Sequence, residues 1–176
     1  HGNALMSVTT TRYPFTDKPA DYRRLAQQLE ALLAGETDLI ANAANTAALL
    51  FDALPAINWA GFYFLRSGEL VVGPFQGKPA CVRIPLGRGV CGSAAAERRT
   101  LVVPDVQAFA GHIACDAASR SEIVVPLLDG GTLLGVLDID SPQPARFDAA
   151  DAAGLEHLAA LFMAATPAAA RALSAA

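Results

Sequence analysis

Charge and cysteine are both scarce in this chain. Only 17% of its 176 residues are charged, against about 25% in an average globular domain. The net charge of −4 argues against nucleic acid or an anionic membrane as the main partner, because both attract basic surfaces. The three cysteines are an odd number, which fits poorly with the disulfide framework of a small secreted protein.

Long apolar runs are also missing, although 53% of the residues are hydrophobic. The most apolar stretch, residues 39–54, carries the polar residues Asn42, Asn45 and Thr46 and is too short to span a bilayer. Residues 1–6 lack the basic and then apolar pattern of a signal peptide, so we expect a short remnant before a native start at Met6, and a cytoplasmic protein. Residues 7–176 are then expected to form one catalytic domain.

Hydrophobic periodicity predicts an α+β fold. Two strand pairs, 58–65 with 69–75 and 122–128 with 132–140, are each joined by a glycine-containing turn that indicates a hairpin. Because hairpins pair antiparallel, we expect a central antiparallel sheet of about six strands with helices on its faces. The other expected elements are a helix capped by Asp21 and ended by Gly35, a helix opened by Thr37 or Asp38 and stopped by Pro55, strand 81–85, short helix 90–97, extended segment 101–103, and a last helix that opens at Phe147 and Asp148.

The cysteines are candidates for thiol chemistry. Cys81, Cys91 and Cys115 are separated by nine and 23 residues, so neither a CxxC redox motif nor zinc-knuckle spacing is present. Free cysteine is among the most buried residue types, so Cys81 and Cys91 are equally well explained as core residues. Cys115 lies in segment 105–120, which has no clear period and is typical of a functional loop. There, His112 or Arg120 would favour its nucleophilic thiolate form.

Three acids and one tryptophan are candidates for ligand binding. Asp138 and Asp140 are two residues apart on an expected strand and so share a face, and the hairpin brings Glu122 towards that face. Crowding and desolvation would raise at least one pKa. The face is either an exposed polar surface or a pocket that binds a cation such as Mg²⁺, holds an ammonium group or supplies a proton. Trp59 is either a core residue or an aromatic wall of that pocket.

Several motifs together resemble a known family. Residues 12–165 are similar to the free methionine-(R)-sulfoxide reductases, GAF-domain enzymes that reduce the free amino acid rather than methionine within proteins. The resemblance rests on INWAGFYF, PLGRGVCGSAA, VPDVQAFAGHIACDAASRSEIVVPL, GVLDIDSP and the Phe-Asp that follows.

The resemblance implies a role for each candidate residue. Cys115 would attack the sulfoxide sulfur and become a sulfenic acid, Cys81 would resolve it as a disulfide, and Cys91 would be a third cysteine able to pair with Cys115 in some members. Trp59 would line the site near the substrate methyl group. The acids that would bind the ammonium group and assist at the sulfoxide oxygen are Glu122, Asp138 and Asp140. The resemblance further implies a homodimer recycled by thioredoxin, with no bound cofactor or metal.

Three alternatives remain open. The chain could be a non-catalytic GAF module that senses a small ligand, a thiol redox switch, or a metal-dependent enzyme that uses the three acids. The stereochemical preference of a reductase does not follow from these residues.

Overall fold

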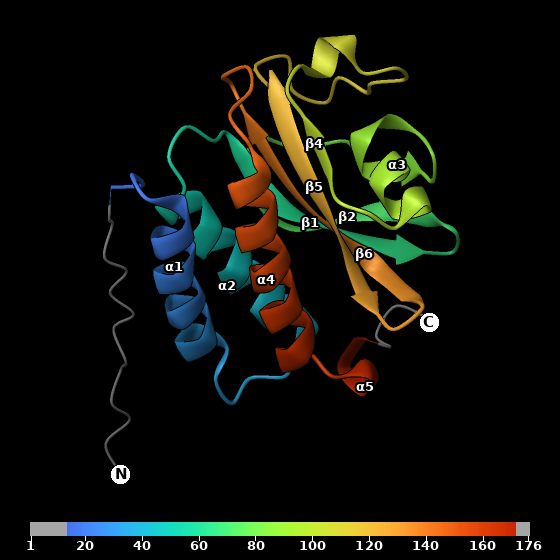
Figure 1. The fold of residues 1–176 in the computed structure, drawn as a ribbon. Coiled ribbons are helices and arrows are strands. Elements are labelled where there is room, and N and C mark those ends of the chain that lie inside the picture. The colour runs from blue at the N-terminus through green and yellow to red at the C-terminus, as the bar shows by residue number, and fades with distance from the viewer. Residues whose placement is uncertain (1–13, 172–176) are drawn as a thin grey trace.

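A six-stranded antiparallel sheet forms the centre of the protein, with helices on both of its faces (Figure 1). The computed structural model describes residues 14–171, so the expectations for residues 1–6 lie outside the described part. The strand order is β3-β2-β1-β6-β5-β4, and the expected α+β class is confirmed. The strands are β1 (Trp59–Arg66), β2 (Glu69–Gly77), β3 (Arg83–Pro85), β4 (Leu101–Val103), β5 (Ser121–Asp129) and β6 (Thr132–Ser141).

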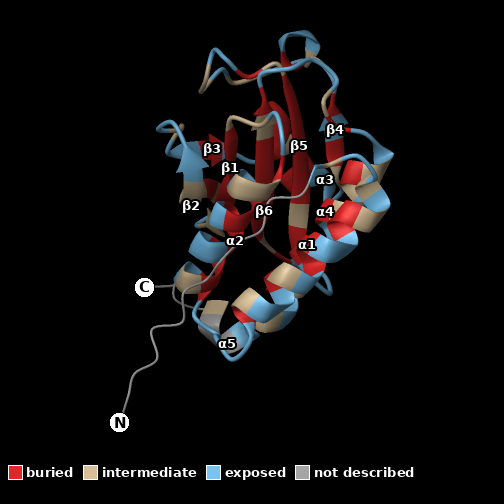
Figure 2. Cartoon of the chain, turned by 90° about the vertical axis from the view of Figure 1, so that its left-hand side faces the viewer, coloured by how far each residue is buried: buried red, intermediate tan, exposed pale blue. Residues whose placement is uncertain are grey.

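The helices divide the sheet into two unlike faces. On one face, α1 (Lys18–Leu33), α2 (Leu39–Ala53) and α4 (Ala149–Ala165) form the larger apolar core, which includes Phe62 of β1. On the other face, α3 (Gly89–Glu97) packs in a smaller core with Trp59 and Tyr63. Figure 2 shows the buried residues concentrated in the central strands. Because successive side chains of a strand alternate, β1 supplies both cores at once.

Two short helices complete the described chain: the 3-10 helix η1 (Val106–Ala108) and α5 (Ala168–Arg171). Between residues 14 and 171, no helix is long and apolar enough to cross a membrane.

The start of the first helix differs from the sequence prediction. Asp17, not Asp21, is the N-cap of α1, and its side chain accepts a hydrogen bond from the Ala20 N–H. Pro19 therefore lies in the first turn, where the missing N–H costs nothing because it has no intrahelical acceptor. Asp21 is buried one turn into the helix and accepts from the Asp17 N–H at 2.9 Å. The predicted cap is therefore one turn too late, because Pro19 is compatible with the first turn of a helix.

The third strand is also shorter than predicted, and this matters for the site. It begins at Arg83 rather than Cys81, so Cys81 lies in irregular chain between β2 and β3. The Cys81 carbonyl oxygen accepts from the Tyr63 hydroxyl at 3.1 Å instead of from a neighbouring strand. The Val82 carbonyl accepts from the Val72 N–H at 2.9 Å. Backbone bonding to β2 therefore continues as far as Val82, and only at Cys81 does a side chain take the place of a neighbouring strand.

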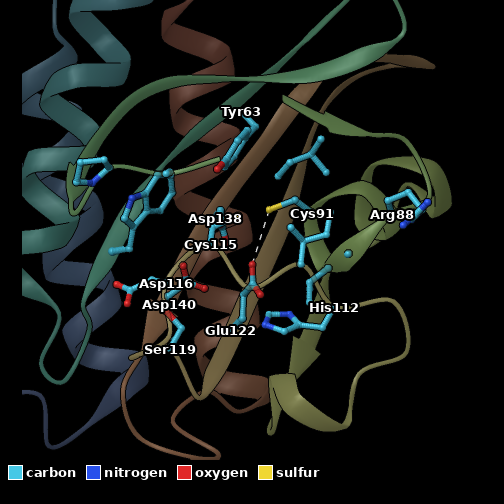
Figure 3. Close-up of a pocket in the computed structure, with 17 residues that line it drawn as sticks. Tyr63, Arg88, Cys91, His112, Cys115, Asp116, Ser119, Glu122, Asp138 and Asp140 are labelled. Carbon is cyan, nitrogen blue, oxygen red and sulfur yellow. Dashed lines mark hydrogen bonds between the residues drawn. The ribbon is translucent and has the colours of Figure 1, made fainter. Parts of the chain in front are cut away.

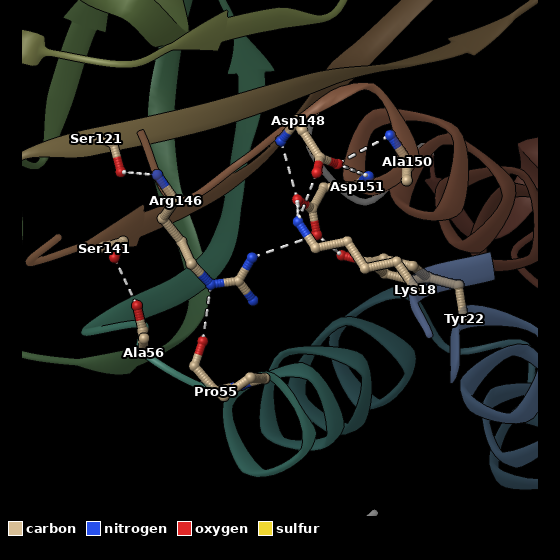
Figure 4. A network of polar contacts seen from close by, with 10 residues as sticks. All are labelled: Lys18, Tyr22, Pro55, Ala56, Ser121, Ser141, Arg146, Asp148, Ala150 and Asp151. Carbon is tan, nitrogen blue, oxygen red and sulfur yellow. Dashed lines mark hydrogen bonds and ion pairs between the residues drawn. The ribbon is translucent and has the colours of Figure 1, made fainter. Parts of the chain in front are cut away.

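A buried polar network joins α1 to α4 on the face of the sheet opposite α3 (Figure 4). Asp151 in α4 is fully buried and accepts hydrogen bonds from Lys18 Nζ at 2.6 Å, the Tyr22 hydroxyl at 2.8 Å and Arg146 Nη1 at 3.3 Å. Asp148 caps α4 through a reciprocal capping box with Asp151. Several donors offset the desolvation of this carboxylate, so the network fixes α1 against α4.

Candidate active site

A cavity opens between the sheet and α3 (Figure 3). It encloses about 570 Å³ of space not filled by atoms, a volume that includes the solvent at its open mouth. The residues that line it come from strands β1, β3, β5 and β6, from the start of α3, and from the irregular segments before β3 and before β5 that contain Cys81 and Cys115. They are Trp59, Tyr63, Pro79, Ala80, Ile84, Arg88, Gly89, Val90, Cys91, His112, Ile113, Cys115, Asp116, Ser119, Glu122, Asp138 and Asp140.

Strand register brings the three predicted acids together. Asp140 of β6 lies opposite Trp59 of β1 on one side and opposite Glu122 of β5 on the other. Asp138 lies two residues earlier on β6, opposite Gly61, where an added side chain would clash with Phe75 of β2. The expectation that the three acids share one sheet face is therefore confirmed, and α3 with its loops covers that face.

Burial makes these acids hard to ionise. Glu122 is 7% exposed and Asp138 is 5% exposed. Loss of solvent raises the pKa of all three carboxyl groups, and neighbouring acid charges raise the pKa of Glu122 and Asp140 further. The Oδ1 atom of Asp138 is buried without a hydrogen-bond partner, an arrangement that is costly unless a ligand supplies a donor. The cluster is therefore suited to hold a proton or to bind a cationic group.

A disulfide joins two of the three predicted cysteines. Cys81 and Cys115 are 34 residues apart in sequence, yet their Cα atoms lie 5.5 Å apart, within the usual range for a disulfide. Both residues are partly exposed, and Cys115 lines the cavity that contains the acids. The structure thus represents the oxidised form of the cysteine pair.

The third cysteine has a different environment. Cys91 is a free, buried thiol in the first turn of α3, and its Sγ donates to Glu122 Oε1 at 3.7 Å. Burial, and then the charges of the nearby acids, raise the pKa of Cys91, so the neutral thiol is favoured. Ligand atoms of Cys91, Glu122 and Asp138 lie within 4.8 Å of one another, the one such group among residues 14–171. Thiolate and carboxylate groups can both ligate a divalent cation.

The cations expected beside Cys115 are only partly present. His112 lines the cavity, but burial lowers the pKa of its imidazole, which favours the neutral form. Arg120 lies outside the cavity lining. The cavity lining includes one guanidinium, that of Arg88 from the loop before α3, and this residue is exposed.

Sequence comparisons connect this geometry to known proteins. The GAF domain family model matches residues 28–165. Protein YtsP of Bacillus subtilis is 61% identical over 137 residues, which cover 77% of this chain and 84% of that protein. The free methionine-R-sulfoxide reductase of Escherichia coli is 55% identical over 144 residues, which cover 82% of this chain and 87% of the relative. The chain belongs to the free methionine-R-sulfoxide reductase family of GAF domains.

A solved structure of this reductase family has the same fold. The enzyme of Neisseria meningitidis, solved in complex with its substrate, is 49% identical with a TM-score of 0.85, and the match covers 90% of this chain and 95% of that one. The resemblance stated from the sequence motifs is therefore confirmed.

Two residues of this GAF domain have roles in the site that the sequence did not indicate. Tyr63 shares the face of Trp59, lines the cavity and bonds to the Cys81 carbonyl. Asn58 directly precedes β1 and bonds to Asp116, next to Cys115. Trp59 and Tyr63 are four residues apart on one strand, which indicated the shared face, but no local pattern indicated what either residue would contact. Trp59 combines both of its predicted roles, because it is buried and also lines the cavity.

Proposed function

We propose that this chain reduces free L-methionine-(R)-S-oxide to L-methionine with cysteine thiols. The observation that supports it most is the position of Cys115, disulfide-bonded to Cys81 at the wall of a cavity that also contains the buried acids Glu122 and Asp138 and the half-buried Asp140. The related Escherichia coli and Neisseria meningitidis proteins are named free methionine-R-sulfoxide reductases, the second in complex with its substrate.

In the first step, the Cys115 thiolate attacks the sulfoxide sulfur. Oxygen transfer converts the sulfoxide and the thiol into methionine and a cysteine sulfenic acid, so sulfur in the substrate is reduced by two electrons and Cys115 is oxidised by two. A sulfoxide oxygen accepts a proton in this step. Burial raises the pKa of Glu122, which favours the protonated carboxyl that can supply this proton.

The second step regenerates the thiol. The Cys81 thiol displaces hydroxide from the sulfenic acid and forms the disulfide with release of water. We assign the external reduction of this disulfide to thioredoxin, whose dithiol supplies two electrons. The cycle as written uses no bound cofactor or metal, because both electrons pass through cysteine sulfur. We assign the enzyme to the cytoplasm, because a reducing compartment keeps the cycle running. We also propose that it is a homodimer, as the family resemblance implies.

Selectivity for the free amino acid follows from charge. Free methionine sulfoxide carries an ammonium group, whereas a methionine residue inside a protein chain has an amide there. Buried carboxylates such as Asp138, with its unpartnered Oδ1, are suited to an ammonium donor. Trp59 offers an apolar face for the substrate methyl group.

A diastereomer-resolved assay tests the proposal. The reduced enzyme is incubated with racemic free methionine sulfoxide and dithiothreitol, and both sulfoxides and methionine are quantified by chromatography. We expect loss of the R form alone, with an equal amount of methionine formed and no effect of a metal chelator. Binding without turnover would favour the small-ligand sensor, and chelator-sensitive turnover would favour the metal-dependent alternative.

Glu122→Gln should stabilise the protein by an amount that grows as pH rises. The pKa of Glu122 is raised in the fold, so its contribution to stability is full below its unfolded pKa of about 4.3 and is lost as pH rises through the folded value. Glutamine does not titrate. We expect a gain of several degrees in Tm at neutral pH, because about 1 kcal/mol shifts Tm by about 2–4 °C at this size.

The measurement is thermal unfolding of both proteins across acid to alkaline pH, with the disulfide state held constant. Glu156→Gln, on an exposed position of α4, is the matched control and should show a flat difference. The stability gain of Glu122→Gln should accompany a loss of turnover of about 100-fold or more, since positioned acids contribute about 10²–10⁴-fold. A pH-independent difference in Tm would contradict the burial argument.

A further inference from the structure

Strand β1 bonds to the chain segment that carries Cys81. The Tyr63 hydroxyl donates to the Cys81 carbonyl oxygen, and the Trp59 indole Nε1 donates to the Lys78 carbonyl oxygen, each at 3.1 Å. The segment between β2 and β3 has no helical or strand structure of its own there. Its path is therefore set in large part by two side chains of β1.

The residue before β1 bonds to the segment that carries Cys115. Asn58 Nδ2 donates to Asp116 Oδ2 and to Ser119 Oγ, each at 3.1 Å. These two residues belong to one tight turn, in which the Ala118 N–H donates to Asp116 Oδ1 at 2.8 Å. The turn begins directly after Cys115, so Asn58 fixes the position at which this cysteine enters it.

Two of the donors, Trp59 and Tyr63, lie on a rigid strand, and Asn58 directly before it donates its backbone N–H to the Asp140 carbonyl of β6 at 2.9 Å. Strand β1 is paired on both sides, with β2 and with β6. Trp59 stacks with Tyr63 at 5.8 Å and with Phe75 at 5.1 Å between ring centroids. None of the bonds to the two cysteine segments uses a sulfur atom, so the same donors and acceptors exist whether the cysteines are reduced or oxidised.

We propose that Asn58, Trp59 and Tyr63 are positioning residues that hold the two cysteine segments within bonding distance in the reduced protein. An intramolecular disulfide forms in proportion to the effective concentration of its thiols, which falls as the segments gain freedom. Chain connectivity alone gives little proximity, because the cysteines are 34 residues apart. The chain at the start of β1 thus positions both cysteine segments and so raises the stability of the disulfide.

Equilibration with glutathione measures this directly. The protein dithiol and oxidised glutathione exchange to give the protein disulfide and two molecules of reduced glutathione, a transfer of two electrons. The equilibrium constant reports the effective concentration of the cysteine pair. No methionine sulfoxide takes part, so the result does not depend on the proposed reductase activity.

Tyr63→Phe and Asn58→Ala are the informative variants. Each removes donor groups while leaving all three cysteines in place. The released segment gains more freedom in the dithiol than in the disulfide, where the Cys81–Cys115 bond itself restrains it. We therefore expect each variant to lower the equilibrium constant, by up to about tenfold, the strength of one hydrogen bond. Thiols are alkylated at each glutathione ratio, and peptide mass spectrometry confirms that Cys81 and Cys115 form the pair. Tyr63→Phe removes only one hydroxyl, so its equilibrium constant can still be measured if Asn58→Ala does not fold.

Tyr22→Phe is the matched control. It also removes a buried tyrosine hydroxyl, which donates to Asp151 at 2.8 Å on the opposite helical face (Figure 4). It should lower the Tm of the reduced protein and leave the glutathione equilibrium constant at the wild-type value. Wild-type constants in both Tyr63→Phe and Asn58→Ala overturn the assignment. So does an equal fall in Tyr22→Phe, because loss of general stability would then explain the effect.

Discussion

Cys115→Ser should abolish methionine formation and leave the fold intact. Serine has nearly the shape of cysteine but is a far weaker nucleophile towards a sulfoxide sulfur, so we expect a loss of at least about 1,000-fold in turnover, as for removal of other catalytic nucleophiles. The measurement is methionine produced from free methionine sulfoxide with excess dithiothreitol. Dithiothreitol makes the assay independent of Cys81, so that only the first chemical step is tested.

The fold of Cys115→Ser is compared with that of reduced wild-type protein. Cys115 lies in irregular chain and is partly exposed, so circular dichroism and the Tm of the reduced forms should agree closely. A variant that still forms methionine at more than a tenth of the wild-type rate would contradict the assignment of the nucleophile. An inactive variant that is also unfolded is tested again as Cys115→Ala.

Cys81→Ser should form about one equivalent of methionine per subunit and then stop when thioredoxin is the only reductant. The nucleophile is intact, so the first turnover proceeds, but the sulfenic acid on Cys115 has lost the thiol to which it is joined in the structure. Dithiothreitol should restore turnover, because a small thiol can reach the partly exposed Cys115. Rapid-quench measurement of methionine gives the burst, and trapping with dimedone identifies the sulfenic acid.

Cys91 is the remaining candidate to replace Cys81 in that experiment. It is buried in α3, its thiol donates to Glu122, and burial raises its pKa, all of which disfavour its reaction as a resolving thiolate. The Cys81→Ser protein should therefore stall to the same extent with or without a second Cys91→Ser change. Multiple turnovers in the single variant that disappear in the double variant would show that Cys91 resolves the sulfenic acid.

The sequence predicted which helices and strands are present better than it predicted where each of them begins. Periods of two and of 3.6 residues are local properties, so the hairpin strands and the last helix lie within a few residues of their predicted positions. The first helix begins at Lys18 because Pro19 is accepted in its first turn. The third strand begins two residues late because side chains of β1, distant in sequence, bond to the chain at Lys78 and Cys81.

The sheet face to which the acid side chains point could also be predicted from the sequence. Alternation along β6 put Asp138 and Asp140 on one face, and the hairpin put Glu122 beside them. The burial of these acids could not be predicted from the sequence. Those acids are buried because α3 and two loops cover that face, and their raised pKa values depend on this cover.

By itself, then, the sequence determined the α+β class, the shared face of the acids and, through its motifs, the family. The family resemblance implied a Cys81–Cys115 disulfide but left Cys91 as a possible partner of Cys115. Only the tertiary structure decided that Cys81 is joined to Cys115 while Cys91 stays a free thiol that donates to Glu122. The physical reason is one of range: the direction of a side chain is fixed by the dihedral angles of its own residue. The approach of two sulfurs 34 residues apart is fixed by contacts that no local pattern encodes.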